Sequence, residues 1–231
     1  MSGLLFSGEI IVEGRLVDAS NATLFVSITD GAESTKAIYK PVAGERPLWD
    51  FPDGNLANRE RAAFIIDRAL AFNHVPLTIL RDGPFGFGMV QQWIDIDEGV
   101  DLEEFFQLND PQLREVALFD AVINNTDRKI GHLIPEQGGH LYICDHGVTF
   151  HAEDKLRTVL WQWAGEELTP AEIATLQALQ NFLDSDESIE LRDLLTAVEL
   201  SALSLRIERL IETRCFPEPN PEWPHIPWPP F

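Results

Sequence analysis

Short strand patterns fill the first part of the chain. β-branched and apolar residues recur between turn-forming segments, and a Pro- and Gly-rich loop follows them over 42–55. Helical spacing then runs from Leu56 to Phe72 and stops near Asn73. The pattern predicts an antiparallel meander that grows to five strands and carries one helix. The strands are expected at 9–17, 23–29, 35–40, 76–81 and 88–94.

Helical periodicity dominates the second half of the chain. Asp110 precedes Pro111, and Thr169-Pro170 is followed by Glu172, which are residues typical of helix starts. Between these starts, the apolar segments HLIP and LYICD flank EQGGH and predict a short hairpin. Helices are expected at 101–108, 111–123, 154–164, 170–183 and 188–213.

These patterns divide the chain into a strand-rich part, a helical part and a tail. A length of 231 residues suits one domain or two lobes that share a cleft. We expect an N-terminal lobe at 1–95, a helical C-terminal lobe at 96–216 and a Pro/Trp-rich tail at 217–231. The tail's closely spaced prolines exclude a regular helix or strand. It either packs its aromatic rings on the domain or offers a polyproline-type ligand to a protein partner.

Composition and charge narrow the classes of molecule that the protein is expected to bind. Hydrophobic residues make up 45% of the chain, as in globular proteins, and 38 acidic against 17 basic residues give a net charge of -21. Such a surface repels polyanions, so we expect no nucleic-acid partner and no stable membrane association. No signal-length apolar run precedes Glu9, and the two cysteines suggest no disulfide framework. A cytoplasmic location is expected.

Two residues of the N-terminal lobe are candidates for phosphate binding. Lys40 ends the third predicted strand, and Glu60 lies early in the following helix, from which it can reach back to the lysine. A lysine oriented by a helix carboxylate holds the α- and β-phosphates of ATP in kinase folds. The alternatives are a solvated lysine and a helix-terminal charge. Ser20, in the small-residue turn between the first two strands, is a weaker candidate for phosphate contact.

Two aspartates in the C-terminal lobe are candidates for chemistry. Asp127 follows an apolar helix and precedes a short apolar strand, which places it at a turn where it can accept or orient a hydroxyl proton. The alternative is a turn cap that pairs with Arg128. Asp145 follows an apolar strand two residues before Gly147, and its hard oxygens suit Mg²⁺ bound together with phosphates.

Four segments together resemble the phosphatidylinositol 3/4-kinase superfamily, especially the type II phosphatidylinositol 4-kinases and their bacterial kinase-like relatives. YKP with the downstream GERP resembles the lysine strand, and NRERAAFII resembles the Glu-bearing helix. NNTDRKIGHLI resembles the catalytic loop, and ICDHGVTF resembles the metal-binding segment. The resemblance covers roughly residues 10–165. It implies an α+β, protein-kinase-like fold with two lobes, an antiparallel sheet and one helix in the first, and mostly helices in the second.

The resemblance also implies an ATP site with a divalent metal, Mg or Mn. Lys40 would contact the phosphates, Glu60 would orient Lys40, Asp127 would take the catalytic-loop position and Asp145 would bind the metal. The hinge beside adenine would be formed by Gln91, Gln92, Trp93 and Ile94.

One position departs from the family pattern. Five residues after the catalytic-loop aspartate the family carries a metal-binding asparagine, and this chain has His132. Imidazole is a softer ligand than an amide oxygen and suits Mn²⁺, Fe²⁺ or Zn²⁺ better than Mg²⁺. The chain therefore has either a different metal preference or one metal contact fewer. A dedicated transition-metal site is a weaker alternative, although its spacing matches no standard zinc pattern. Its ligands would come from His132, His140, His146 and His151.

The leading hypothesis is an ATP-dependent phosphotransferase that acts on an unknown hydroxyl acceptor, either a protein or a small soluble molecule. The lipid substrate does not transfer with the fold, because no basic or amphipathic membrane face is evident. A nucleotide-binding pseudokinase with a regulatory or scaffolding role is the alternative, which His132 keeps open. Transfer of the AMP part of ATP, with the nucleotide bound in reverse, also stays open.

Overall fold

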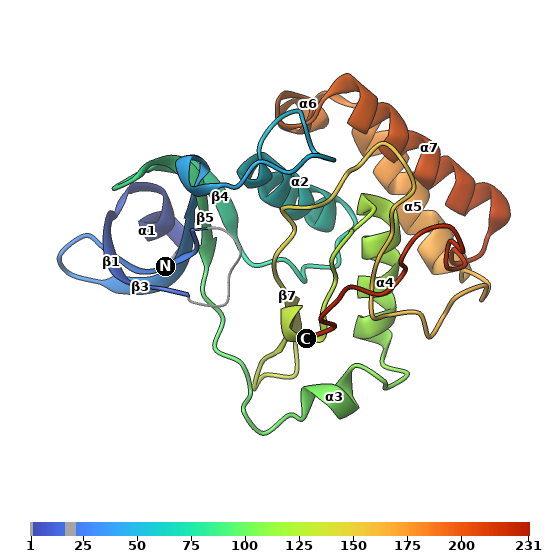
Figure 1. Cartoon of the computed structure of the whole chain (residues 1–231), viewed down its shortest axis with the longest axis horizontal. Coiled ribbons are helices and arrows are strands. Elements are labelled where there is room, and N and C mark those ends of the chain that lie inside the picture. The colour runs from blue at the N-terminus through green and yellow to red at the C-terminus, as the bar shows by residue number, and fades with distance from the viewer. Residues whose placement is uncertain (1, 17–21) are drawn as a thin grey trace.

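The computed structural model describes residues 2–16 and 22–231 (Figure 1). In Figure 1 a sheet lies to the left and most of the helices lie to the right, and the chain passes from β5 to α3 along the lower edge. This arrangement confirms the predicted α+β fold with an antiparallel sheet followed by a helical part. In the described part of the chain, no helix is both long and apolar enough to cross a membrane.

The first lobe is built on a five-stranded antiparallel sheet in the order β1-β2-β3-β5-β4. Alternate residues such as Val26 and Ile28 point into its core, where they meet Ala37 and Tyr39. A short helix that was not predicted, α1 (Ser2–Ser7), adds Leu5 to this core. The strands are β1 (Glu9–Arg15), β2 (Leu24–Thr29), β3 (Ser34–Pro41), β4 (Thr78–Gly83) and β5 (Gly86–Gln92).

The helix α2 (Leu56–Ala69) joins the two lobes. Asn55 caps its start by accepting the backbone N–H of Asn58. Its apolar residues Ala62, Ala63 and Ile66 are fully buried, and they belong to the core of the C-terminal helices rather than to the core of the sheet. The helix that carries Glu60 is therefore fixed to the second lobe.

The second lobe surrounds α4 with helices and a hairpin. Asp110 caps α4, and Thr169 forms a capping box with Glu172 at the start of α5, as their sequences predicted. The elements are α3 (Leu102–Phe105), α4 (Pro111–Ile123), β6 (Leu133–Pro135), β7 (Leu141–Ile143), α5 (Pro170–Asp184), α6 (Ile189–Leu194) and α7 (Ala197–Thr213). Short 3-10 turns are η1 (Val42–Gly44), η2 (Ile130–His132) and η3 (Asp186–Ser188).

Two predicted helices are wrong. Residues 154–164 contain no helix, because the segment bonds to the loop after α4, with the Arg128 N–H donating to the Arg157 carbonyl at 3.0 Å. The predicted helix 188–213 is two helices, α6 and α7, separated at Leu195 and Thr196. Thr196 caps α7 through a capping box with Glu199, so a new helix starts there.

The tail after Pro217 has no helix or strand, as predicted. It runs along the second lobe, where the His225 carbonyl accepts the backbone N–H of Thr158 at 3.0 Å. The Pro230 carbonyl accepts the N–H of Ile130 at 2.8 Å, which places the C-terminus beside η2, near β7 (Figure 1). Trp228 stays 88% exposed.

Candidate active site between the lobes

Lys40 lies at the end of β3, facing two carboxylates. Its Nζ is 2.6 Å from Oε1 of Glu60 on α2 and 2.9 Å from Oδ1 of Asp145 after β7. Burial lowers the pKa of Lys40, but Asp145 and Glu60 outweigh it and raise the pKa above its usual range. A Cβ at Gly88 would clash with the Lys40 carbonyl, so glycine allows β5 to approach β3 here. The structure thus joins three predicted residues in one charged group.

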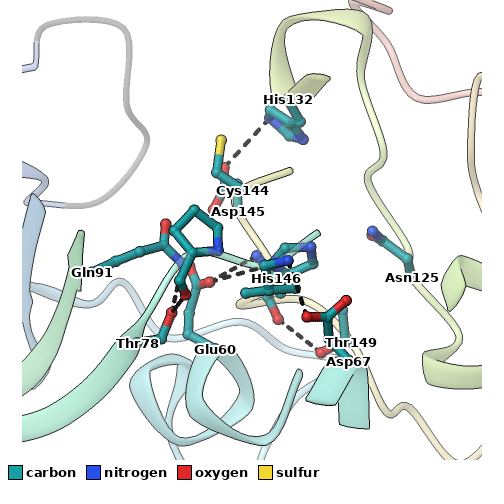
Figure 2. A network of polar contacts seen from close by, with 12 residues as sticks. Glu60, Asp67, Thr78, Gln91, Asn125, His132, Cys144, Asp145, His146 and Thr149 are labelled. Atoms are coloured by element: carbon teal, nitrogen blue, oxygen red, sulfur yellow. Dashed lines mark hydrogen bonds and ion pairs between the residues drawn. The ribbon is translucent and has the colours of Figure 1, made fainter. Parts of the chain in front are cut away.

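A buried polar network supports this group from the second lobe. Arg128 is fully buried and binds both carboxylate oxygens of Asp120 on α4, with its Nη2 at 2.9 Å from Oδ1. The same guanidinium donates to Nε2 of His146 at 2.8 Å. The backbone N–H of His146 in turn donates to Oε2 of Glu60 at 2.9 Å (Figure 2). The chain of contacts therefore runs from Asp120 on α4 through Arg128 and His146 to Glu60, the partner of Lys40.

Asp127 lies between two cations. Its carboxylate oxygens are 3.5 Å from Nζ of Lys129 and 3.5 Å from Nη2 of Arg157, and its backbone N–H donates to Asn125 Oδ1. Burial raises the pKa of Asp127, although both cations oppose that shift. Arg128 turns away from Asp127 toward Asp120, so the predicted alternative of an Asp127–Arg128 pair is wrong. A carboxylate with a raised pKa is suited to accepting a hydroxyl proton.

His132 faces the second oxygen of Asp145. Its Nε2 is 3.5 Å from Oδ2 of Asp145, and its Nδ1 accepts the backbone N–H of Lys129 at 3.4 Å. Burial lowers the pKa of His132 to about 4, so the ring is neutral at pH 7. With Nδ1 as the acceptor, the proton lies on Nε2 and faces the carboxylate. For Nε2 to bind a cation, the ring must transfer this proton to Nδ1 and release the Lys129 N–H.

The residues suit a cation that is bound together with phosphates. The Lys40 ammonium holds the pKa of Asp145 well below its usual range, against the effect of burial, so this carboxylate is ionised. Among residues 2–16 and 22–231, no group of three or more His, Cys, Asp or Glu side chains is arranged to hold a metal by itself. Mg²⁺ characteristically takes one or two carboxylates and completes its shell with phosphate and water oxygens. The dedicated transition-metal site has no ligand set in this part of the chain.

A cavity of about 420 Å³ opens beside the charged group. It lies between the lobes, because residues from β3 and the loop after it face residues of the segments 126–127 and 145–148 of the second lobe. Lys40, Asp127 and Asp145 all line it. Thr23, which follows the β1–β2 turn, also lines it, whereas Ser20 lies outside the described residues. A cavity of this size is typical of small-ligand sites.

The predicted hinge lines a second cavity of about 400 Å³, which contains Gln92, Trp93 and Ile94 but not Gln91. The Gln91 side chain is buried and donates to Thr78 Oγ1 at 2.8 Å (Figure 2), so it supports the sheet. Tyr142 of β7 closes the cavity from the second lobe. Burial raises the pKa of the neighbouring Cys144 to about 12, so that thiol stays protonated.

Sequence reasoning did not find the supporting residue Asp120, and it gave Arg128 and His146 other roles, as a partner of Asp127 and as a weaker candidate metal ligand. Asp120 is a lone acidic residue among the apolar positions of α4, and that is the one local signal that marks it as buried and paired. Nothing in the local sequence shows that His146 bridges Arg128 to Glu60, because the three residues come from different segments.

Two solved structures share this fold. A crystal structure of the Golgi casein kinase matches with a TM-score of 0.54 at 14% identity, covering 92% of this chain and 73% of that one. The Golgi casein kinase with Mn/ADP bound gives a TM-score of 0.55 at 13% identity, covering 92% and 74%. These likenesses show a kinase-like fold, and the specific relationship to phosphatidylinositol 3/4-kinases stays a prediction.

Sequence comparison gives a nearer relative. No protein-family model matches the chain. Protein Rv2133c of Mycobacterium tuberculosis (strain ATCC 25618 / H37Rv) is 40% identical over an alignment of 263 positions, which covers 99% of this chain and 94% of that protein. The chain therefore belongs to the family of Protein Rv2133c.

Proposed function

We propose that the chain is an ATP- and divalent-metal-dependent phosphotransferase of the phosphatidylinositol 3/4-kinase-like type, acting on a soluble hydroxyl acceptor. One observation carries the proposal. Lys40 is held between Glu60 and Asp145 at the edge of a cavity that also contains Asp127. A fixed lysine, an ionised carboxylate and a proton acceptor are the parts that phosphoryl transfer requires.

The two cavities match the two ends of a nucleotide. Tyr142 lines the hinge cavity and Asp145 lines the Lys40 cavity, and the two residues are separated by one extended segment. Three residues of extended chain span roughly 10 Å. Adenine would bind against Gln92, Trp93 and Ile94, and the phosphates would reach Lys40.

The chemistry then follows from the positions of the side chains. Asp127 accepts or orients the proton of the acceptor hydroxyl while the oxygen of that hydroxyl bonds to the γ-phosphorus of ATP. The bond from the γ-phosphorus to the bridging oxygen breaks, and ADP leaves with the electron pair. Lys40 neutralises phosphate charge, and Glu60 fixes its position. A bound divalent cation would supply further neutralisation of the phosphate oxygens, and Asp145 together with His132 would hold it.

Mg and Mn are the proposed cations. The ionised carboxylate of Asp145 suits both, and an imidazole at position 132 favours the softer Mn. The Golgi casein kinase structure with Mn/ADP bound shows that a protein of this fold binds that pair. This supports the proposal that the present chain also binds a nucleotide together with Mn.

The test is ATP turnover with Mg²⁺ and with Mn²⁺ in the parent protein and in Asp145→Asn. Loss of the carboxylate charge removes a metal ligand and a partner of Lys40, so turnover should fall by at least about a hundredfold. Asp193→Asn, on the exposed side of α6, is the matched control and should keep the parent rate. Equal turnover in Asp145→Asn and the parent protein would contradict the proposal.

A nucleotide-binding pseudokinase is the second candidate. His132 in place of the expected asparagine favours it, because its Nε2 proton faces Asp145 where a cation would bind. Nucleotide binding without turnover under either metal would support this regulatory role. Intact-mass measurement of reacted acceptor separates an added phosphate from an added AMP.

A further inference from the structure

A short loop between η1 and α2 forms part of the wall of the Lys40 cavity. The loop consists of residues 46–50, which contain no helix or strand. Three of its side chains line the cavity, namely those of Arg46, Leu48 and Asp50. Its position therefore decides how much of the cavity is covered.

Both ends of this loop are fixed to α2. On one side, Glu45 accepts the backbone N–H groups of Leu56 and Ala57, each at 2.9 Å. On the other side, the buried ring of Phe51 has its centroid 4.9 Å from the guanidinium carbon of Arg59. Any movement of the loop is therefore that of a flap hinged at Glu45 and Phe51.

The middle of the loop contacts Lys155 of the second lobe. The Nζ atom of Lys155 lies 5.4 Å from the centroid of the Trp49 ring. The same atom lies 3.9 Å from Oδ2 of Asp50. A single ammonium group thus faces two consecutive residues of the loop and joins them to the second lobe.

Contacts outside the loop keep Lys155 in place. Its backbone N–H donates to Oδ1 of Asn124 at 3.0 Å, and its Nζ lies 5.2 Å from the centroid of the Trp223 ring in the tail. Oε2 of Glu153 is 3.4 Å from the same Nζ and supplies a counter-charge. Because only 6% of Lys155 is exposed, the loop meets a fixed cation rather than a mobile surface side chain.

The contacts on the loop side are weak. Trp49 is 86% exposed, and a cation over the face of an exposed indole stabilises a structure only slightly. An ion pair with an N–O distance of 3.9 Å is likewise weak. The loop can therefore leave Lys155 at a small cost in free energy, while Lys155 keeps its contacts with Asn124 and Trp223.

We propose that residues 46–50 form a lid over the Lys40 cavity, and that Lys155 is a positioning residue that holds this lid closed. When Trp49 and Asp50 leave the ammonium group, the loop turns about its fixed ends and the cavity opens to a ligand. When they return, the loop lines the cavity again. The inference rests on the proposed function for the identity of the ligand, a nucleotide whose phosphates reach Lys40.

Hydrogen exchange of the full chain without ligand tests the role of Lys155. Trp49→Ala and Lys155→Met each remove one side of the same contact, so each should raise the exchange rates of the amide hydrogens of 48–50, corrected for intrinsic rates, at least about threefold. Trp49→Phe keeps an aromatic face and should stay close to the parent rates. Trp228→Ala removes an equally exposed indole from the tail and is the matched control.

Stopped-flow binding of a fluorescent, non-hydrolysable ATP analogue with Mn²⁺ tests whether the loop acts as a lid. A lid that opens more easily speeds the passage of the ligand in both directions. Trp49→Ala and Lys155→Met should therefore raise the association and the dissociation rate constants about 3- to 10-fold, with a smaller change in Kd. Trp228→Ala should keep both rate constants of the parent protein.

Three results overturn the inference. Unchanged exchange at 48–50 in both variants would show that Lys155 does not hold the loop. Faster exchange of the α4 amide hydrogens together with those of the loop would show that Lys155 supports the second lobe as a whole. A loop that exchanges faster while both rate constants keep their parent values is a wall and not a lid.

Failure of the proposed function is distinguishable from these results. If the analogue does not bind the parent protein with Mg²⁺ or with Mn²⁺, the proposed function fails. The lid then stands if the two variants raise exchange at 48–50 alone, and it falls if they do not.

Discussion

Two histidines of the candidate site are held neutral by burial. The side chain of His132 is 14% exposed, and burial lowers its pKa to about 4. Burial, with Arg128 second, lowers the pKa of His146 well below its usual range. In the unfolded chain both rings would titrate near 6.5. Between these values the unfolded state binds protons that the folded state excludes.

Stability should therefore fall as the pH falls from about 6.5 to about 4. Stability rises with pH wherever the unfolded state binds more protons, so the contribution of His132 is complete above pH 6.5 and lost toward pH 4. For His132 alone the loss amounts to roughly 3 kcal/mol. Urea unfolding at pH 7, 6, 5 and 4.5 measures it, and His132→Asn should flatten the pH dependence.

The exposed His225→Gln is the control for that measurement, since its ring lies at the surface of the tail. It should retain the pH dependence of the parent protein. A parent protein whose unfolding free energy stays constant between pH 6.5 and 4.5 would show that the two active-site rings are not buried in the neutral form.

At the scale of elements, α4 fixes the loop that follows it, which carries Asp127, through one ion pair. Asp120 and Arg128 are both fully inaccessible, and Asn125 Nδ2 and Thr158 Oγ1 donate to the same carboxylate. Arg128 also donates to the Cys144 carbonyl at 2.9 Å, so the pair links the loop to the segment after β7 that carries Asp145. Breaking a buried pair of this kind greatly lowers the free energy of unfolding, because the remaining charge is left without a partner and without access to water.

Arg128→Met should therefore lower the free energy of unfolding by about 3–5 kcal/mol, since it leaves Asp120 charged and buried. Adding Asp120→Leu should recover part of that loss, because no unpaired charge remains. Arg209→Gln, which breaks an exposed pair, should cost less than about 1 kcal/mol. Urea unfolding, monitored by tryptophan fluorescence, compares the free energies of unfolding of these variants with that of the parent protein. If Arg128→Met and Arg209→Gln lose equal stability, the buried pair does not fix the loop.

Local sequence signals predicted most of the helices and strands, but not the polar network between them. The strands and the capped helices α4 and α5 were predictable, because turn residues and caps are local features of the sequence. The meeting of Lys40 with Glu60 and Asp145 was instead implied by the resemblance of four separate segments to a kinase family. The structure of residues 154–164 was not predictable, because hydrogen bonds to the loop after α4 replace the helix that their composition favoured. Asp120, Arg128 and His146 meet only in the folded chain.

At the scale of the whole molecule, α2 ties the two lobes together through ion pairs as well as through its apolar face. Arg59 is 3% exposed, and its Nη2 is 2.6 Å from Oε1 of Glu199 on α7. Arg61, two residues later, pairs with Glu190 on α6 at 2.7 Å, where the glutamate is 54% exposed. Because Glu60 lies between these arginines, the partner of Lys40 is fixed to the second lobe, and the position of the sheet decides whether the pair forms.

Glu199→Gln and Glu190→Gln form a matched test of this anchoring. The first leaves Arg59 buried without its partner and should lower the free energy of unfolding by about 3 kcal/mol, whereas the second breaks an exposed pair and should cost less than about 1 kcal/mol. Native-state hydrogen exchange gives an independent measurement. If α2 belongs to the second lobe, its amide hydrogens should exchange at rates similar to those of α4 and α7. They should exchange more slowly than the amide hydrogens of β1, which lies at the sheet edge. Exchange of α2 together with β1 and β2 would instead place the helix with the sheet, and Lys40 and Glu60 would then move as one body.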